Sequence, residues 1–161
     1  MEKISVLFVC LGNICRSPSA HGVFEHLVER KGESESFLID SAGTAAYHIG
    51  KAPDPRTQVA ARRRGYALEH LRARAVEAAD FERFNYILAM DDANLRDLRR
   101  LCPRGFHGHL GLFLDFAEGV KHKEVPDPYY TSGEQGFEEV LDLVEVASQG
   151  LYRRLQESGI E

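Results

Sequence analysis

Residues 4–18 of the chain read ISVLFVCLGNICRSP, and this stretch decides the fold class. Its first seven residues are apolar almost throughout and rich in β-branched side chains, which is typical of a strand buried on both faces of a parallel sheet. Gly12 and Asn13 tolerate a positive φ and so favour a tight loop. Ser17 and Pro18 predict the N-cap and the first position of a helix. The stretch therefore predicts a strand, a loop and a helix.

Similar elements are expected along the rest of the chain. Gly32 should end the first helix, because apolar residues at helical spacing stop just before it. Further strands are predicted over 37–44, 85–90 and 110–116, and further helices over 56–65, 78–84, 91–100 and 136–156. Strands that alternate with helices indicate a parallel sheet built from right-handed crossovers. We therefore predict one α/β domain over residues 1–161, with a four-stranded parallel sheet flanked by helices.

The composition excludes several classes of protein. The chain has 161 residues, with 20 Lys and Arg against 25 Asp and Glu, and its formal net charge is −5. Such an acidic chain is a poor candidate for nonspecific nucleic-acid binding. The longest apolar runs are too short to span a bilayer, and no secretory signal pattern is present. We expect a cytoplasmic monomer that binds neither nucleic acid nor membrane.

The loop between the first strand and the first helix carries the chemistry. Open α/β sheets form their sites at this place, beside a helix N-terminus. Backbone N–H groups of such a loop can form an anion nest, and Arg16 can bind two phosphate oxygens. The same positive field favours the thiolate form of Cys10, to which Ser17 can donate a hydrogen bond. The loop therefore predicts a nucleophilic cysteine that acts on a bound tetrahedral oxyanion.

The segment CLGNICRSP at 10–18 resembles the phosphate-binding loop of the low-molecular-weight protein tyrosine phosphatases. Other blocks resemble the same family in its order along the chain, namely DSAGT at 40–44, PDPRT at 53–57, NYILAMD at 85–91, DPYY at 127–130 and GFEEVLDLVE at 136–145. The resemblance implies a flavodoxin-like fold and hydrolysis of phosphotyrosine and aryl phosphomonoesters without metal or other cofactor. It also implies a tyrosine-phosphorylated protein as substrate, with phosphate or sulfate as product-like ligands.

The resemblance assigns the catalytic roles. Cys10 would attack phosphorus and become phosphocysteine, while the loop amides and Arg16 would hold the phosphoryl oxygens. A leaving phenolate needs a proton, and Asp-Pro pairs occur at 54–55 and at 127–128. Spacing alone does not choose between the two pairs. The resemblance selects Asp127 as the general acid, and as the base that later activates water.

A further set of residues is expected to shape the loop or to line the substrate slot. Asn13 and Ser17 resemble the family's loop-shaping residues, with Ser41 as an outer partner. Tyr47, Tyr129 and Tyr130 resemble the aromatic residues that line the slot for the substrate's ring. A sister group that removes phosphate from arginine has Thr where this chain has Ile14, which favours a tyrosine substrate. The full predicted set is Leu11, Gly12, Asn13, Ile14, Cys15, Ser17, Tyr47, Tyr129 and Tyr130.

Two other functions compete with this interpretation. A thiol-dependent arsenate reductase shares the fold and the loop, but it needs a relay of further cysteines, and Cys102 is the only cysteine downstream of the loop. A phosphate-binding module without catalysis would keep Arg16 but would not need both Cys10 and Asp127. Turnover of p-nitrophenyl phosphate separates an enzyme from such a module.

Two details of the resemblance concern residues around the loop. Cys15 corresponds to a cysteine that can form a disulfide with the nucleophile and so protect it from irreversible oxidation. The family often places a His two residues before an Ala-Arg pair, where it supports the loop. Here Leu71 stands in that position and His70 lies one residue off, so His70 is not assigned to the site. The other histidines lack metal-ligand spacing, and no metal is expected.

Overall fold

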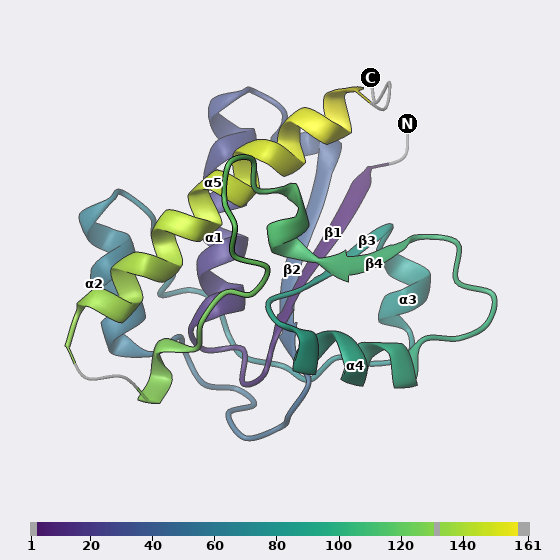
Figure 1. Cartoon of the computed structure of the whole chain (residues 1–161), viewed down its shortest axis with the longest axis horizontal. Coiled ribbons are helices and arrows are strands. Elements are labelled where there is room, and N and C mark those ends of the chain that lie inside the picture. The colour runs from purple at the N-terminus through teal and green to yellow at the C-terminus, as the bar shows by residue number, and fades with distance from the viewer. Residues whose placement is uncertain (1–2, 131–132, 158–161) are drawn as a thin grey trace.

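A computed structural model of the protein describes residues 3–130 and 133–157. Four strands form one parallel sheet in the order β2-β1-β3-β4, which confirms the predicted sheet (Figure 1). Their bounds are β1 at Ile4–Cys10, β2 at Phe37–Gly43, β3 at Tyr86–Ala89 and β4 at His109–Leu112. The central strand β1 is apolar because it is covered on both faces; Val6, Leu7, Phe8 and Val9 are fully buried.

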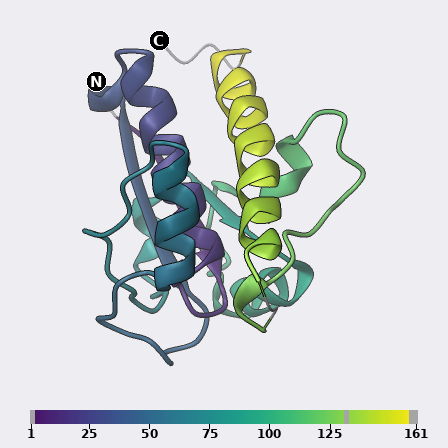
Figure 2. The same cartoon turned by 90° about the vertical axis from the view of Figure 1, so that its left-hand side faces the viewer.

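Within the described residues, five α-helices surround this sheet. They are α1 at Arg16–Arg30, α2 at Pro55–Arg63, α3 at Asp80–Arg83, α4 at Asp92–Leu101 and α5 at Gln135–Glu157. Helices α1 and α5 pack against each other on one face (Figure 2). Val6 and Phe8 point into their core, whereas Leu7 and Val9 pack with α3 and α4 on the other face. This alternation along β1 follows from the two-residue period of a strand.

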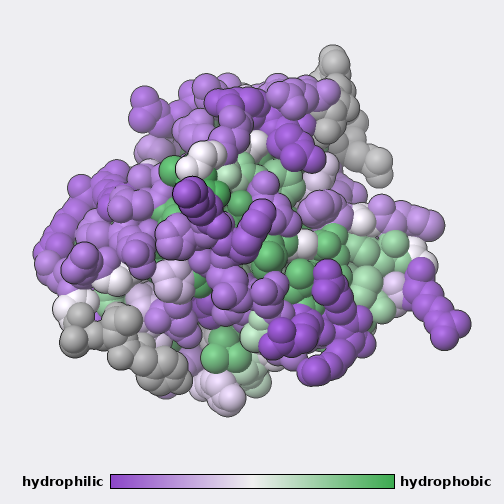
Figure 3. All heavy atoms as spheres, viewed as in Figure 1, coloured by the Kyte–Doolittle hydropathy of each residue, from purple (hydrophilic) through white to green (hydrophobic). Residues whose placement is uncertain are grey.

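The polar sides of these helices face water. On the face seen in Figure 3, hydrophilic residues dominate the outer surfaces of α2 and α5. The exposed positions of α5 include Asp142, Gln149 and Arg153, while Val144, Ala147 and Leu151 are buried. The long amphipathic helix predicted over 136–156 is therefore confirmed. In the part of the chain that the structure describes, no helix is both long and apolar enough to cross a membrane.

The strand predicted over 110–116 is too long. Strand β4 ends at Leu112, which pairs with Ala89 at the end of β3, and residues 113–116 form a 3₁₀ helix. The next carbonyl of the β3 segment, that of Met90, accepts a hydrogen bond from the Val125 amide instead. The buried apolar run therefore turns away from the sheet and packs against α5.

The start of α1 also differs from the prediction. The helix begins at Arg16, and Ser17 and Pro18 lie inside its first turn instead of forming the N-cap and first position. Pro18 is tolerated there because first-turn amides have no intrahelical acceptor. The Ser17 hydroxyl is used elsewhere, next to the Cys10 sulfur. Gly32 ends the helix region as predicted, with φ of 73°.

Candidate active site

The segment Cys10–Arg16, here called the phosphate loop, connects β1 to α1. Cys10 is the last residue of β1, and its sulfur accepts a hydrogen bond from the Asn13 amide at 3.2 Å. Asn13 has φ of 57°, the one positive φ of a non-glycine residue in the described ranges. This left-handed conformation turns the chain sharply, which Asn tolerates better than most residues. The loop therefore bends its backbone around the thiol, as a nest for an anion requires.

Two side chains behind the loop hold the Cys10 sulfur. Ser17 Oγ lies 3.0 Å from Cys10 Sγ, and Asn13 Nδ2 donates to Ser17 Oγ at 2.8 Å. Because Ser17 Oγ accepts from Asn13, its own hydrogen can go to the sulfur or to the Ala42 carbonyl, which is farther away at 3.5 Å. Asn13 and Ser17 are buried, at 2% and 0% exposure, and so shape the loop from behind.

The guanidinium of Arg16 is held by residues far away in the sequence. It donates to Asp91 Oδ2 at 2.7 Å and to the Val125 carbonyl at 3.0 Å. Burial by itself would lower the pKa of Arg16, but Cys10, Asp91 and Asp127 raise this pKa above its ordinary value. The guanidinium therefore stays charged. Sequence analysis assigned Asp91 no role in the site; it also caps α4 by accepting from the Asn94 amide.

The segment Val125–Tyr130, here called the acid loop, brings Asp127 next to Arg16. Asp127 Oδ2 lies 3.6 Å from Arg16 Nη2, and Asp127 Oδ1 accepts from the Tyr129 amide at 3.1 Å. The side chain of Asp127 keeps 30% of its surface exposed. It shares a pocket with Cys10 and Arg16, so the three residues predicted as catalytic are brought together.

The other Asp-Pro pair has a different task. Asp54 caps α2 by accepting from the Arg56 amide at 2.8 Å, and its carboxylate binds the Arg56 guanidinium at 2.9 Å. Burial opposes ionisation, but these hydrogen bonds from Arg56 hold the pKa of Asp54 below its ordinary value. Asp54 therefore stays ionised and is a poor proton donor. It is also absent from the lining of the pocket that contains Cys10.

Most of the predicted substrate-binding residues line the same pocket. These are Leu11, Gly12, Ile14, Cys15, Tyr47 and Tyr129. Tyr47 is 71% exposed and stands at the rim. Only the backbone of Tyr130 belongs to the described structure, so the prediction for its side chain lies outside the described residues.

His48 also lines the pocket, and sequence analysis missed it. Its ring lies 5.8 Å from that of Tyr129, between centroids. A Cβ on Gly12 would come within 2.9 Å of the His48 ring, so the loop approaches this wall closely at a glycine. No motif marked His48, because the contact depends on how the loop at 44–54 folds over the phosphate loop.

The remaining cysteines differ from Cys10. Burial raises the pKa of Cys15 to about 12, so this thiol is protonated at neutral pH. Cys102 caps the C-terminus of α4 and does not line the pocket. Cys15 is therefore the one thiol beside Cys10 among the residues that line the pocket, and Cys102 does not supply the further cysteine that an arsenate reductase needs. Within the described residues, no group of three or more His, Cys, Asp or Glu side chains could hold a metal ion.

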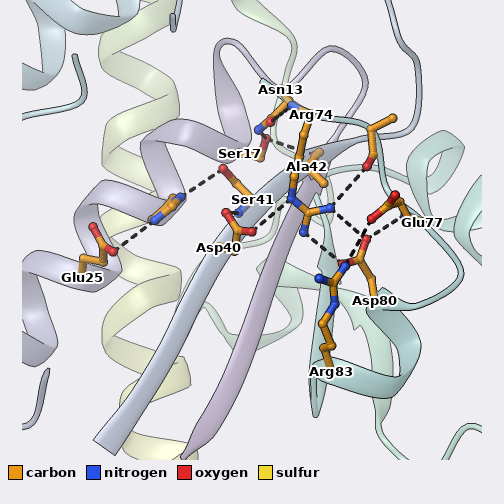
Figure 4. Close-up of polar contacts among 12 residues, drawn as sticks. Asn13, Ser17, Glu25, Asp40, Ser41, Ala42, Arg74, Glu77, Asp80 and Arg83 are labelled. Carbon is orange, nitrogen blue, oxygen red and sulfur yellow. Dashed lines mark hydrogen bonds and ion pairs between the residues drawn. The ribbon is translucent and has the colours of Figure 1, made fainter. Parts of the chain in front are cut away.

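The hydrogen-bond partners behind the loop are residues that the sequence did not indicate (Figure 4). His70 is exposed and does not line the pocket; the Arg74 amide donates to Asn13 Oδ1 at 3.0 Å. The Ser41 hydroxyl is bonded to His21, at 3.1 Å, and His21 is bonded to Glu25. Sequence analysis missed the buried His21, which lies on the inner face of α1 without a motif around it.

Comparison with known proteins agrees with this geometry. Residues 5–160 match the family model described as low molecular weight phosphotyrosine protein phosphatase. The chain is 47% identical over 137 residues to the phosphatase of that name from Schizosaccharomyces pombe, covering 84% of this chain and 86% of the relative. It is 42% identical over 153 residues to the low molecular weight protein-tyrosine-phosphatase YfkJ of Bacillus subtilis, covering 95% and 96%.

A solved structure shows the same arrangement of the chain. The protein tyrosine phosphatase of Entamoeba histolytica, crystallised with Hepes in its active site, superposes with a TM-score of 0.93 at 40% identity and covers 98% of this chain and 99% of that one. The family match, the identities and the superposition each extend over most of the chain. The chain therefore belongs to the low molecular weight phosphotyrosine protein phosphatase family and is a hydrolase of phosphotyrosine.

Proposed function

We propose that this protein tyrosine phosphatase works in two steps through a phosphocysteine at Cys10. In the first step the Cys10 thiolate attacks phosphorus, the bond from phosphorus to the phenolic oxygen breaks, and Asp127 gives its proton to the leaving phenolate. In the second step Asp127 takes a proton from water, the water oxygen attacks phosphorus, and the phosphorus–sulfur bond breaks. Inorganic phosphate leaves and the thiolate is restored.

One observation carries this proposal: Cys10, Arg16 and Asp127 line a single pocket. Arg16 and the amides of the phosphate loop can stabilise the charge on the three transferred oxygens, which is the main electrostatic need of phosphoryl transfer. The 3.6 Å distance between Asp127 and Arg16 supports an acid beside the phosphoryl group that Arg16 would bind. The Ser17 hydroxyl, 3.0 Å from the sulfur, can stabilise the thiolate when it leaves in the second step.

The assignment of the acid is tested by comparing two Asp-Pro variants. Asp127→Asn should lower kcat on phenyl phosphate by about 10²- to 10⁴-fold, the usual contribution of general acid catalysis. The loss should be smaller on p-nitrophenyl phosphate, because its leaving group needs less protonation. The matched control is Asp54→Asn, which can still cap α2 and should keep most activity.

The outcomes separate the claims. Absence of turnover by the wild-type protein would reject the enzyme. Wild-type turnover of phenyl phosphate by Asp127→Asn would reject Asp127 as the acid while leaving the nucleophile untouched. A larger loss in Asp54→Asn than in Asp127→Asn would move the acid to the other pair.

The substrate is a tyrosine-phosphorylated protein, and phosphate or sulfate binds as a product-like ligand. Supporting this choice, Tyr47 and Tyr129 flank the pocket with aromatic rings and Ile14 adds an apolar surface, which suits a planar phenyl ring. Phosphoproteomics of cells that hold a Cys10→Ser substrate trap should enrich phosphotyrosine peptides. Enrichment of phosphoarginine peptides instead would overturn this specificity.

The proposal also covers the extent of the domain, the oligomeric state and the location of the protein. The whole of residues 1–161 forms one phosphatase domain that acts as a monomer in the cytoplasm and binds no nucleic acid. The net charge of −5 supports the last point. Light scattering should give the mass of one 18.1 kDa chain across working concentrations; a concentration-dependent dimer would contradict it.

The pair Cys10 and Cys15 makes the enzyme redox-sensitive. Peroxide would oxidise the Cys10 thiolate to sulfenic acid, and the Cys15 thiol would displace water from it to form a disulfide. Both thiols line the same pocket, and both are free in this structure. Peroxide-inactivated wild type should recover activity with dithiothreitol, and Cys15→Ala should recover poorly. Equal recovery of the two proteins would reject the disulfide.

A further inference from the structure

Asn13 connects the phosphate loop to a segment outside it. Its amide donates to the Cys10 sulfur and its Nδ2 to Ser17 Oγ, so it determines both hydrogen bonds that approach the thiol from behind. Its third polar group, Oδ1, accepts from the Arg74 amide at 3.0 Å. This bond orients the side-chain amide, because Nδ2 faces Ser17 only while Oδ1 faces Arg74. The direction of the Ser17 hydroxyl therefore depends on the Arg74 peptide.

The Arg74 peptide belongs to an irregular stretch of chain. Residues 64–79 contain no helix or strand of the sheet, apart from an isolated bridge between Gly43 and Ala75. The Arg74 carbonyl accepts from the Gly43 amide at 2.8 Å. Backbone hydrogen bonds also hold its neighbours, since the Val76 amide donates to Gly43 and the Ala73 amide to Lys51. Further contacts, made by a side chain, fix the segment from the side of α3.

The Arg74 side chain supplies these contacts (Figure 4). Its Nη1 and Nη2 donate to the two oxygens of Asp80 at 3.0 Å each, and its Nε donates to Asp40 at 3.1 Å. Asp80 is fully buried at the start of α3 and also accepts from Arg83 and from the Glu77 amide. A bidentate pair of this kind restricts both rotation and translation of the guanidinium.

We propose that the Arg74–Asp80 pair is a positioning device for the phosphate loop: it holds the peptide that orients Asn13, and through Asn13 and Ser17 it sets the hydrogen bonds to the nucleophile. The pair touches neither substrate nor reacting atoms. Its charge is present at neutral pH, because burial would raise the pKa of Asp80 but Arg74 and its other donors hold that pKa below the ordinary value. The proposal rests on the catalytic role of Cys10 proposed above.

The pair should act on the rate more than on substrate binding. If Asn13 turns, the Ser17 hydroxyl no longer stabilises the departing thiolate, so hydrolysis of phosphocysteine slows. Asp80→Asn and Arg74→Ala should therefore lower kcat about tenfold, with KM for p-nitrophenyl phosphate changed about twofold or less, the scale on which supporting residues act. Arg74→Lys, which keeps the charge but loses the bidentate contact, should fall between these variants and the wild type.

The matched control is Arg83→Ala. Arg83 donates to the same carboxylate, at 2.7 Å, but contacts Glu77 and not the Arg74 peptide. Its removal perturbs Asp80 without releasing Asn13. We expect wild-type kcat from this variant, measured at a temperature where circular dichroism shows all proteins to be folded.

A second measurement needs no turnover. Iodoacetate carries a carboxylate that the anion nest attracts, whereas iodoacetamide is neutral. The ratio of their alkylation rates at Cys10, taken at one pH, therefore reports the shape of the nest and not the thiolate fraction. The ratio should fall in Asp80→Asn and Arg74→Ala and stay unchanged in Arg83→Ala. In an Asn13→Ala background, Asp80→Asn should change it no further, because the connection is already lost.

Several results would overturn the inference. Asp80→Asn and Arg74→Ala could lower thermal stability while the folded enzyme keeps wild-type kcat and alkylation ratio, which would make the pair structural only. An equal loss in Arg83→Ala, or a further fall of the ratio in the Asn13→Ala background, would also reject it. These results differ from failure of the proposed function, which would appear as absence of turnover by the wild-type protein.

Discussion

The phosphate loop and the acid loop contact the same pocket, yet they are held in different ways. Within the phosphate loop, Asn13 and Cys10 are bonded to each other and to Ser17, and all are buried. The acid loop is held by distant residues: Arg16 donates to the Val125 carbonyl 109 residues away, and Arg56 donates to the Tyr129 carbonyl 73 residues away. The hydrogen bonds that approach the Cys10 sulfur are built locally, whereas the proton donor is attached by residues from distant parts of the chain.

This difference predicts how each loop responds to substitution. A locally bonded, buried loop has few alternative conformations, so a change at its reacting atoms removes the chemistry. A loop attached through several separate contacts loses its position gradually as contacts are removed. Effects should therefore be large in the phosphate loop and graded around the acid loop.

The largest effect is expected at the nucleophile. Cys10→Ser replaces a thiolate with a hydroxyl that is hardly ionised at neutral pH, so kcat on p-nitrophenyl phosphate should fall about 10⁴-fold or more. Binding of inorganic phosphate, measured by calorimetry, should stay within several-fold of the wild type because the nest is retained. Substantial residual turnover would move the nucleophile away from this loop.

Within the phosphate loop, Arg16→Lys should give the next largest loss. Lysine keeps the charge but cannot reach Asp91 and two phosphoryl oxygens with one planar group, so we expect kcat/KM to fall about 10²- to 10³-fold. Steady-state kinetics with phosphotyrosine measures the loss. A variant within several-fold of the wild type would show that charge alone suffices, and that the 2.7 Å contact with Asp91 is unimportant for catalysis.

Removing the attachment of the acid loop should have a moderate effect. Besides its bond to the Tyr129 carbonyl, the Arg56 guanidinium lies 5.8 Å from the centroid of the Tyr129 ring and 4.7 Å from that of Phe137. Arg56→Ala should lower kcat on phenyl phosphate about five- to tenfold, because Asp127 is held less firmly, and should affect p-nitrophenyl phosphate less.

The control for this variant lies on the same helix. Arg63 of α2 forms an exposed ion pair with Glu134, and an exposed pair contributes little. Arg63→Ala should therefore keep wild-type rates on both substrates. Equal losses on the two substrates in Arg56→Ala would show that the acid is not the group affected.

The smallest effect concerns Asp80, behind the phosphate loop, and the pH dependence of the free energy of unfolding. The pKa of Asp80 is lowered in the folded protein, because its ion pairs favour the ionised carboxylate. These ion pairs therefore stabilise the fold above the ordinary aspartate pKa of about 4, and this contribution is lost as the pH falls through the pKa of the folded protein. Wild type should exceed Asp80→Asn in free energy of unfolding by about 2 kcal/mol at pH 7. Urea unfolding should show the two proteins converging as the pH falls below the ordinary aspartate pKa; a constant difference would contradict the ionic contribution.

Elements with strong local patterns were predicted well from the sequence. The apolar run of β1 and the amphipathic pattern of α5 lie where they were expected, because burial on two faces or on one stripe dictates their residue types. The predicted strand over 110–116 was too long because the end of β3, which no local pattern encodes, limits its pairing. Ser17 was predicted both as a helix N-cap and as a neighbour of the Cys10 thiolate, and the structure keeps only the second of these roles.

By itself, the sequence determined the order of strands and helices and the pairing of a thiol with a guanidinium six residues later, since both depend on neighbours along the chain. Only the tertiary structure decided which Asp-Pro carboxylate joins Cys10, that Asp91 holds Arg16, and that Arg74 holds Asn13. These contacts join the carboxyl ends of separate strands and the loops beyond them. Their geometry exists only after the parallel sheet has brought those ends to one edge.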